Sequence, residues 1–331
     1  MTDSGATPTS LTEHEARDRA ALLDVDRYDI RIDLRELADG ERWLATSSIV
    51  FSCRRPGAST FVDIDGEVLS ATLNDIELDV SKHAGGRLPL PRLAAENMLT
   101  VSSVQTDTGS GNAILRSVDP QDKLVYVWST FEPDGAHRAW ACFDQPDLKA
   151  VHGFQVSAPT EWTVLSNSAA EVVLDRDDGG RLWIFEDTPR LSSYVVVVNA
   201  GPFHAMRDFR GGFSLGLYCR QSLRPFLERD AAELFELTEQ GLTFFGERFA
   251  RPFGQERYDQ VFVPDFGGAM ENWGCITWAD SFLHRVPPTY AQRGFRALVL
   301  LHEMAHQWFG DLVTMRWWDD LWLNEAFEIG R

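Results

Sequence analysis

The sequence predicts an all-β N-terminal domain, a β-sandwich or saddle, followed by the start of an α+β domain. At 331 residues the chain is too long for one ordinary core, which favours two domains. From residue 25 to 202 the pattern is one of short strands, and long helical patterns begin only after Pro202. We therefore assign residues 1–20 to a disordered tail, 21–202 to the β-rich domain and 203–331 to the incomplete α+β domain.

The β-rich domain is predicted from alternation of apolar and polar residues with period two. Residues 27–36, RYDIRIDLRE, place Tyr28, Ile30, Ile32 and Leu34 on one face and charges on the other. Turn signals such as RRPG, HAGG and DRDDGG separate the segments, which indicates antiparallel strands. Further strand-like segments are 61–66, 71–80, 98–106, 153–166, 180–189 and 193–203.

The second domain mixes both periodicities. Residues 214–220 and 257–266 have the composition of strands, whereas 229–250 form an amphipathic helical pattern interrupted by a glycine. Residues 293–313 are apolar nearly all round, so we predict a buried helix there. A third helix begins in WDDLWLNEAFEIGR, residues 318–331, with one of the two aspartates as its N-cap.

Composition limits the partners and the compartment. The net charge is −19, with 50 acidic against 31 basic residues, so nucleic acid and anionic membranes are poor partners and a cationic substrate is favoured. Cys53, Cys142, Cys219 and Cys275 lie far apart without metal-ligand spacing, which is typical of reduced thiols. No signal peptide or membrane-spanning run is evident, and we expect a cytoplasmic monomer.

The residues with the clearest chemistry lie in HEMAHQWFGDLVTMRWWDDLWLNE, residues 302–325. On a helix, His302 and His306 project in the same direction and can converge on one zinc ion. Glu303 lies at the flank, where a general base could reach a water molecule. Glu325 is the candidate third ligand, because the intervening stretch lets the chain turn back. Two histidines and one carboxylate make an open, catalytic type of zinc site.

Each segment also has a simpler interpretation. His302 and His306 are otherwise an ordinary pair of core or surface histidines, although an unpaired polar cluster in a buried helix would be costly. Upstream, VPDFGGAMENWGCITW (263–278) has glycines that permit close backbone approach before Glu271. By itself it is a turn between strands with a solvated glutamate.

Together these segments resemble the M1 family of zinc aminopeptidases, the aminopeptidase N group. The resemblance rests on GGAMEN at 267–272, HEMAH at 302–306, Glu325 within WLNEAF, and STFEPDGAHRAWACFDQPDLKA at 129–150. It implies that the second domain is the start of a thermolysin-like (gluzincin) catalytic domain. It also implies release of N-terminal amino acids from peptides with a free N-terminus, by water that Glu303 activates at one zinc ion.

The family's site roles transfer residue by residue. The zinc ligands would be His302, His306 and Glu325, and Glu271 would bind the α-amino group with Glu132 as its partner. Two carboxylates at one end of a cleft hold an ammonium group and block a longer peptide. The backbone around Gly268 and Ala269 would pair with the substrate strand. The resemblance also implies that Met270 and Asn272 bind the substrate.

Two departures from the family pattern matter. Thr130 stands where the family has glutamine, which would alter a subsite contact. The family's catalytic tyrosine lies beyond the zinc glutamate and has no counterpart in this chain, and losing an oxyanion donor costs about 10²–10³ in rate. We therefore expect an N-terminal fragment of a longer enzyme, weakly active or inactive alone. The remaining alternatives are a zinc endopeptidase or epoxide hydrolase-like enzyme, and a non-catalytic β-sandwich binding module.

Overall fold

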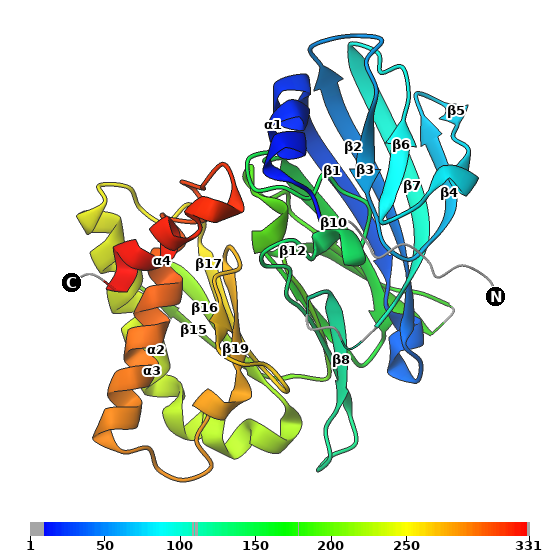
Figure 1. Cartoon of the computed structure of the whole chain (residues 1–331). Helices are drawn as coiled ribbons and strands as arrows, with labels where there is room; N and C mark the ends of the chain where they lie inside the picture. The colour runs from blue at the N-terminus through cyan, green and yellow to red at the C-terminus, as the bar shows by residue number, and fades with distance from the viewer. Residues whose placement is uncertain (1–9, 108, 110–111, 178, 330–331) are drawn as a thin grey trace, which may run out of the picture.

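The computed structural model describes residues 10–107, 109, 112–177 and 179–329. The first nine residues of the predicted tail lie outside this description. Two parts follow one another along the chain, an all-β part and an α+β part (Figure 1). The change occurs between β14 (Val198–Gly201) and β15 (His204–Arg210), which belong to different sheets.

The N-terminal domain is all-β, as predicted, with three sheets. The largest has the strand order β12-β13-β10-β1-β2-β7-β4-β5, the second β11-β14-β9-β8, and the third β3-β6. The bounds in the first are β1 Leu23–Asp33, β2 Arg42–Cys53, β4 Glu67–Leu73, β5 Ile76–Glu77, β7 Glu96–Thr106, β10 Val151–Pro159, β12 Ala170–Asp175 and β13 Gly180–Phe185. The others are β3 Thr60–Asp63, β6 Arg87–Leu90, β8 Ile114–Val118, β9 Val125–Ser129 and β11 Thr163–Ser166.

The large sheet is not wholly antiparallel, which corrects the prediction. β1 pairs with β2 in antiparallel fashion but with β10 in parallel, from Arg27 opposite Val151 to Asp33 opposite Ser157. Parallel neighbours need a long connection, and here more than a hundred residues separate the two strands. Turn signals between neighbouring segments could not reveal such a distant pairing.

The predicted apolar face of β1 is confirmed. Tyr28, Ile30 and Ile32, and Leu34 just after the strand, are each at most 2% exposed. They belong to a continuous core that extends from the β-sheets into the α+β domain. The two domains are therefore packed against each other without a solvated gap between their cores.

Helix α1 (Glu13–Leu22) corrects the predicted disordered tail. Its start carries a capping box in which Thr12 and Glu15 satisfy each other's backbone N–H groups. Arg19, 2% exposed, donates to the Asp63 carboxylate over 2.6 Å and fixes the helix against β3. The composition of this segment indicated disorder, whereas its capping signal and one buried ion pair stabilise a helix.

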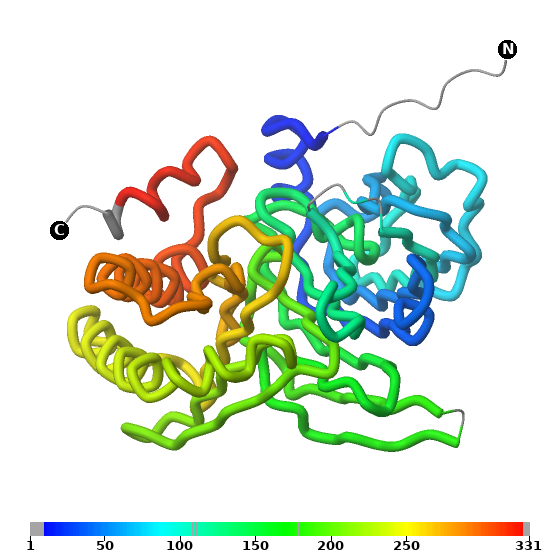
Figure 2. The backbone as a smooth tube through the Cα atoms, turned by 90° about the horizontal axis from the view of Figure 1, so that it is seen from below, coloured from blue at the N-terminus to red at the C-terminus, as the bar shows by residue number. Residues whose placement is uncertain are grey.

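The α+β domain is built on one five-stranded sheet with the order β15-β16-β17-β19-β18. Its central strands β16, β17 and β19 are parallel, and β15 and β18 are antiparallel edge strands. Helices α2 and α3 lie side by side, with α2 against β15 and β16 (Figures 1 and 2). The bounds are β16 Phe213–Cys219, β17 Arg257–Val263, β18 Ala269–Met270, β19 Cys275–Ala279, α2 Arg224–Arg248, α3 Tyr290–Ala305 and α4 Trp322–Ile329.

The glycine in α2 does not interrupt the helix. A Cβ atom at Gly241 would lie 2.6 Å from Met304 Sδ and 2.8 Å from Leu301 Cδ2. Gly241 is thus the point where α2 and α3 approach each other most closely. Glycine lowers helix propensity, but at position 241 the absence of a side chain allows the two helices to pack closely.

Helix α3 differs from its prediction in length and burial. It ends at Ala305 rather than at residue 313, because the chain turns at Gly310, whose φ is +129°. Its outer face is also exposed, with Phe295 59% and Leu298 61% accessible. Neither predicted aspartate caps α4; both lie in a preceding 3-10 turn, Trp318–Asp320.

Two expectations about composition can be compared with the fold. All four cysteines are buried and unpaired with one another, as expected. Among the residues that the structure describes, no helix combines the length and the apolar character required to cross a bilayer.

Candidate zinc and amine-binding site

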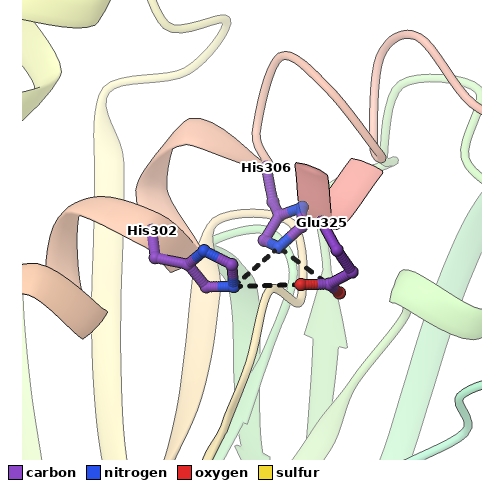
Figure 3. A group of neighbouring side chains, drawn as sticks. All are labelled: His302, His306 and Glu325. Atoms are coloured by element: carbon purple, nitrogen blue, oxygen red, sulfur yellow. Dashed lines mark hydrogen bonds and ion pairs between the residues drawn. The ribbon is translucent and has the colours of Figure 1, made fainter. Parts of the chain in front are cut away.

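The two histidines are brought together by helix α3. The helix begins with a capping box formed by Thr289 and Gln292, and His306 is the residue that ends it. The backbone N–H of His306 still donates to His302 O over 3.3 Å, so the helical spacing holds through both residues. Their Nε2 atoms are 3.3 Å apart (Figure 3).

Glu325 meets both rings from the short helix α4. Its Oε2 lies 3.3 Å from His302 Nε2, and its Oε1 lies 3.9 Å from His306 Nε2 (Figure 3). For a tetrahedral ion with bonds of about 2.0–2.2 Å, donor atoms lie about 3.4 Å apart. The hydrogen bond from His302 keeps the pKa of Glu325 below its usual value. The three donors therefore fit one zinc ion, and this was the arrangement expected from the sequence.

The ring of His306 is oriented by the backbone of the following turn. Its Nδ1 lies 3.1 Å from Phe309 O, so Nδ1 carries the proton in this arrangement and Nε2 is the acceptor. A Cβ at Gly310 would lie 3.3 Å from that Nδ1 and 3.5 Å from Asn324 Nδ2. Glycine at this position lets the turn pass close to the imidazole.

Glu303 and Glu271 border the same space. Both are almost fully buried, at 5% and 3% exposed. One carboxylate oxygen of each lies within 4.8 Å of the other and of a ring nitrogen of His306. The structure thus places the expected base and the expected amine-binding carboxylate beside the histidines.

The segment that carries Glu271 lies at the edge of the sheet. β18, Ala269–Met270, pairs with β19 on one side and forms the edge of the described sheet. Gly268 has φ +141°, and a Cβ added at Gly267 or Gly268 would meet nothing within 4 Å. An open edge of this kind suits main-chain pairing with an extended peptide.

Two residues predicted to bind substrate have buried side chains. Asn272 is fully buried, donates to Val196 O over 3.3 Å and accepts from Thr277 Oγ1 over 3.0 Å. Met270 is 2% exposed within the core. Their side chains hold the segment in place, and substrate binding by these two residues stays a prediction.

Gln307 was missed by the sequence reasoning. It is fully buried, accepts from Gly274 N–H over 2.9 Å and donates to Glu271 O over 3.0 Å. The residue after His306 thus ties the histidine-bearing helix to the segment with Glu271. An amide inside an otherwise apolar helical stretch was the available signal, because a buried amide requires partners.

Glu132 reaches the site from the N-terminal domain. Burial, together with the charges of Glu271 and Glu325, raises its pKa to about 8, while His306 acts in the opposite direction. Glu132 therefore interacts electrostatically with carboxylates of the other domain. Thr130 is buried, and its N–H donates to Ala113 O. Four carboxylates around two imidazoles favour the binding of cations.

Comparisons with known proteins identify the family of this chain. The model of the peptidase family M1 domain matches residues 233–329, and that of the peptidase M1 N-terminal domain matches 113–195. An aminopeptidase N from Streptomyces lividans is 42% identical over 327 residues, which is 96% of this chain and 37% of the relative.

More distant relatives carry similar names. A probable aminopeptidase 1 from Sulfurisphaera tokodaii is 30% identical over 92% of this chain and 38% of its own length. A glutamyl aminopeptidase from Rattus norvegicus is 36% identical over 63% of this chain and 22% of its own length. The chain thus spans little more than a third of the first two relatives. With a β-rich N-terminal domain, the start of a catalytic domain and both family models in sequence, this chain belongs to peptidase family M1.

Proposed function

We propose that this chain carries the metal-binding and amine-binding part of a zinc-dependent aminopeptidase. The observation that carries the proposal is the convergence of His302, His306 and Glu325 at the spacing of a tetrahedral ion. When bound, one zinc ion would polarise the scissile carbonyl and make a water molecule more acidic. The buried Glu303 carboxylate beside it accepts the proton of the attacking water.

Specificity for a free N-terminus follows from the carboxylates. Glu271 and Glu132 come from different domains, and the charge of Glu271 raises the pKa of Glu132. A substrate ammonium group relieves that repulsion and makes charge-assisted hydrogen bonds. An acetylated N-terminus offers no positive charge, so it gains nothing there.

The peptide backbone would pair with β18. Residues Gly268 and Ala269 lie at the open edge, where backbone groups can bond to an extended substrate. We further propose peptides with a free N-terminus as substrates and a monomer acting in the cytoplasm, without nucleic-acid or membrane partners. The unpaired thiols and the net charge of −19 support this setting. For the 331-residue chain alone we propose weak or no turnover.

Zinc binding is tested by metal analysis of the purified chain. We expect one zinc per chain, removable by chelator, and at least about 100-fold weaker zinc binding in Glu325→Gln, since even partners of ligands change affinity by about 10–100-fold. Asp320→Asn is the matched control, because Asp320 is an exposed carboxylate in the turn before α4. Equal zinc affinity in Glu325→Gln and the wild type would remove the proposed site.

Amine recognition can be tested without turnover. Leucine hydroxamate and its N-acetyl derivative are titrated into the zinc-loaded chain, and the free amine should bind about 10–100-fold more tightly, as for one or two charged hydrogen bonds. Glu271→Gln should reduce that ratio without releasing zinc. Equal binding of the two compounds would favour an endopeptidase or another zinc hydrolase over an aminopeptidase.

A further inference from the structure

Two side chains of the N-terminal domain bind the loop that joins the zinc histidines to Glu325. Three consecutive carbonyl groups of this loop, those of residues 310–312, accept hydrogen bonds from them. Tyr194 Oη donates to Gly310 O over 3.2 Å. Lys149 Nζ donates to Asp311 O over 2.7 Å and to Leu312 O over 3.1 Å. Within the loop, the Thr314 hydroxyl also donates to Gly310 O and, over 3.3 Å, to Asp311 O.

Tyr194 is also joined to the helix that carries Glu325. Asn324, the preceding residue, is 4% exposed and donates to Tyr194 Oη over 3.4 Å. The Tyr194 ring is fully buried and packs edge-on against Trp318, with the ring centroids 5.5 Å apart. One hydroxyl therefore connects the loop after His306 to the start of α4.

The third ligand depends on such contacts more than the histidines do. The histidines belong to α3, a helix of sixteen residues with a capping box, so their spacing is set locally. The described part of α4 covers eight residues, and a helix of that length is not stable by itself in water. Its position must come from tertiary contacts, and the loop before it is bonded to the N-terminal domain.

Lys149 makes an anchor suited to this purpose. Burial lowers its pKa to about 8, while the Asp311 charge acts in the opposite direction. A protonated amine makes hydrogen bonds roughly twice as strong as neutral ones. The Lys149 ammonium therefore binds the two carbonyl groups of the loop more strongly than a neutral donor would.

We propose that Lys149 and Tyr194 are positioning residues that set the place of Glu325, so that the N-terminal domain determines the zinc affinity of the catalytic domain. This inference rests on the proposed zinc site. The inference adds that contacts with the N-terminal domain, and not α4 alone, fix the position of Glu325. Neither residue belongs to the proposed zinc donors or to the proposed amine-binding carboxylates.

The test measures zinc affinity in Lys149→Met and Tyr194→Phe by competition with a chromophoric chelator. We expect Lys149→Met to bind zinc about 10–100-fold more weakly, the range for partners that orient ligands, and Tyr194→Phe to lose less. Lys149→Arg should recover most of the affinity because its guanidinium can still bond two carbonyls. The matched controls are Lys82→Met and Tyr290→Phe, whose side chains are exposed.

Cobalt substitution separates positioning from stability. At saturating cobalt, Lys149→Met should show altered visible d–d bands, because the carboxylate would meet the ion at a different distance. A residue that merely stabilises the fold would lower the unfolding temperature and leave those bands unchanged. If Lys149→Met does not fold, Tyr194→Phe provides the same comparison with a smaller change.

The outcomes of the two proposals are distinguishable. A wild-type chain without stoichiometric zinc would contradict the proposed function itself. Stoichiometric zinc in the wild type, with affinity within twofold and unchanged cobalt bands in both Lys149→Met and Tyr194→Phe, would overturn the positioning role alone. Weaker zinc binding together with altered bands, rescued by Lys149→Arg, would support it.

Discussion

Replacement of Gln307 by leucine tests how the histidine-bearing helix is tied to the segment that carries Glu271. The amide of Gln307 is the described partner of two buried backbone groups, Gly274 N–H and Glu271 C=O. Leucine has a similar size and can make neither hydrogen bond. Both backbone groups would then stay buried without a partner, at a cost of about 1–3 kcal/mol each.

The loss should therefore total about 2–6 kcal/mol in the free energy of unfolding, with little added by a cavity. For a chain of this size, about 2 °C of melting temperature corresponds to each kcal/mol, which predicts a fall of about 4–12 °C. The contact with Glu271 O also sets where its carboxylate points. We expect the preference for leucine hydroxamate over its N-acetyl derivative to shrink as well.

Thermal unfolding followed by circular dichroism at 222 nm, in chelator and in zinc, measures the first effect. Gln240→Leu is the matched control, because Gln240 is exposed on α2 and bonds only to Glu236 among the contacts described. A Gln307→Leu protein that melts within about 1 °C of the wild type, with its amine preference intact, would refute the reasoning.

Three further changes give distinct expectations. Gly310→Ala places a methyl group 3.3 Å from His306 Nδ1 at φ +129°, so we expect a loss of about 1–3 kcal/mol and weaker zinc binding by chelator competition. Burial acts to lower the pKa of His137, but its hydrogen bond to Asp144 outweighs this effect and the pKa is raised to about 9. The pair should therefore stabilise the fold fully below pH 6.5, and this stabilisation should be lost as pH rises through 9. The difference in urea midpoint between wild type and His137→Gln should therefore shrink from pH 6 to pH 9.5. Arg220 pairs with the carboxylates of Asp119 and Asp280, and Arg220→Met leaves both without this cation. We expect the free energy of unfolding, measured in urea, to fall by about 3–5 kcal/mol. A fall below about 1 kcal/mol would contradict a stabilising role for Arg220.

The convergence of His302, His306 and Glu325 could be predicted from the sequence because it depends on local spacing. Positions 302 and 306 share a face in any helix, and Glu325 needed only a turn and a short helix to return. The all-β character of the first domain was equally local, since period-two alternation directly reflects a half-buried strand. The end of α3 was misplaced, because a glycine turn inside an apolar stretch leaves the composition helical.

The contacts between distant segments could not be predicted in this way. Lys149 and Asp311 are 162 residues apart, and nothing in either local pattern indicates that they meet. The parallel pairing of β1 with β10 has the same origin. Asn272 shows a different limit: a polar residue beside a functional glutamate looks available to substrate until its burial is known.

The two-residue length of β18 has a consequence for selectivity. If a peptide pairs with β18 as proposed, a strand this short would align only its first few backbone groups and make no backbone contact with the rest. The short strand also disfavours edge-to-edge association, because an exposed edge of two residues is too small for the sheet of a second copy to pair with it. A longer β18 would be expected to lower selectivity for the first residue of the peptide and to promote association between copies of the chain.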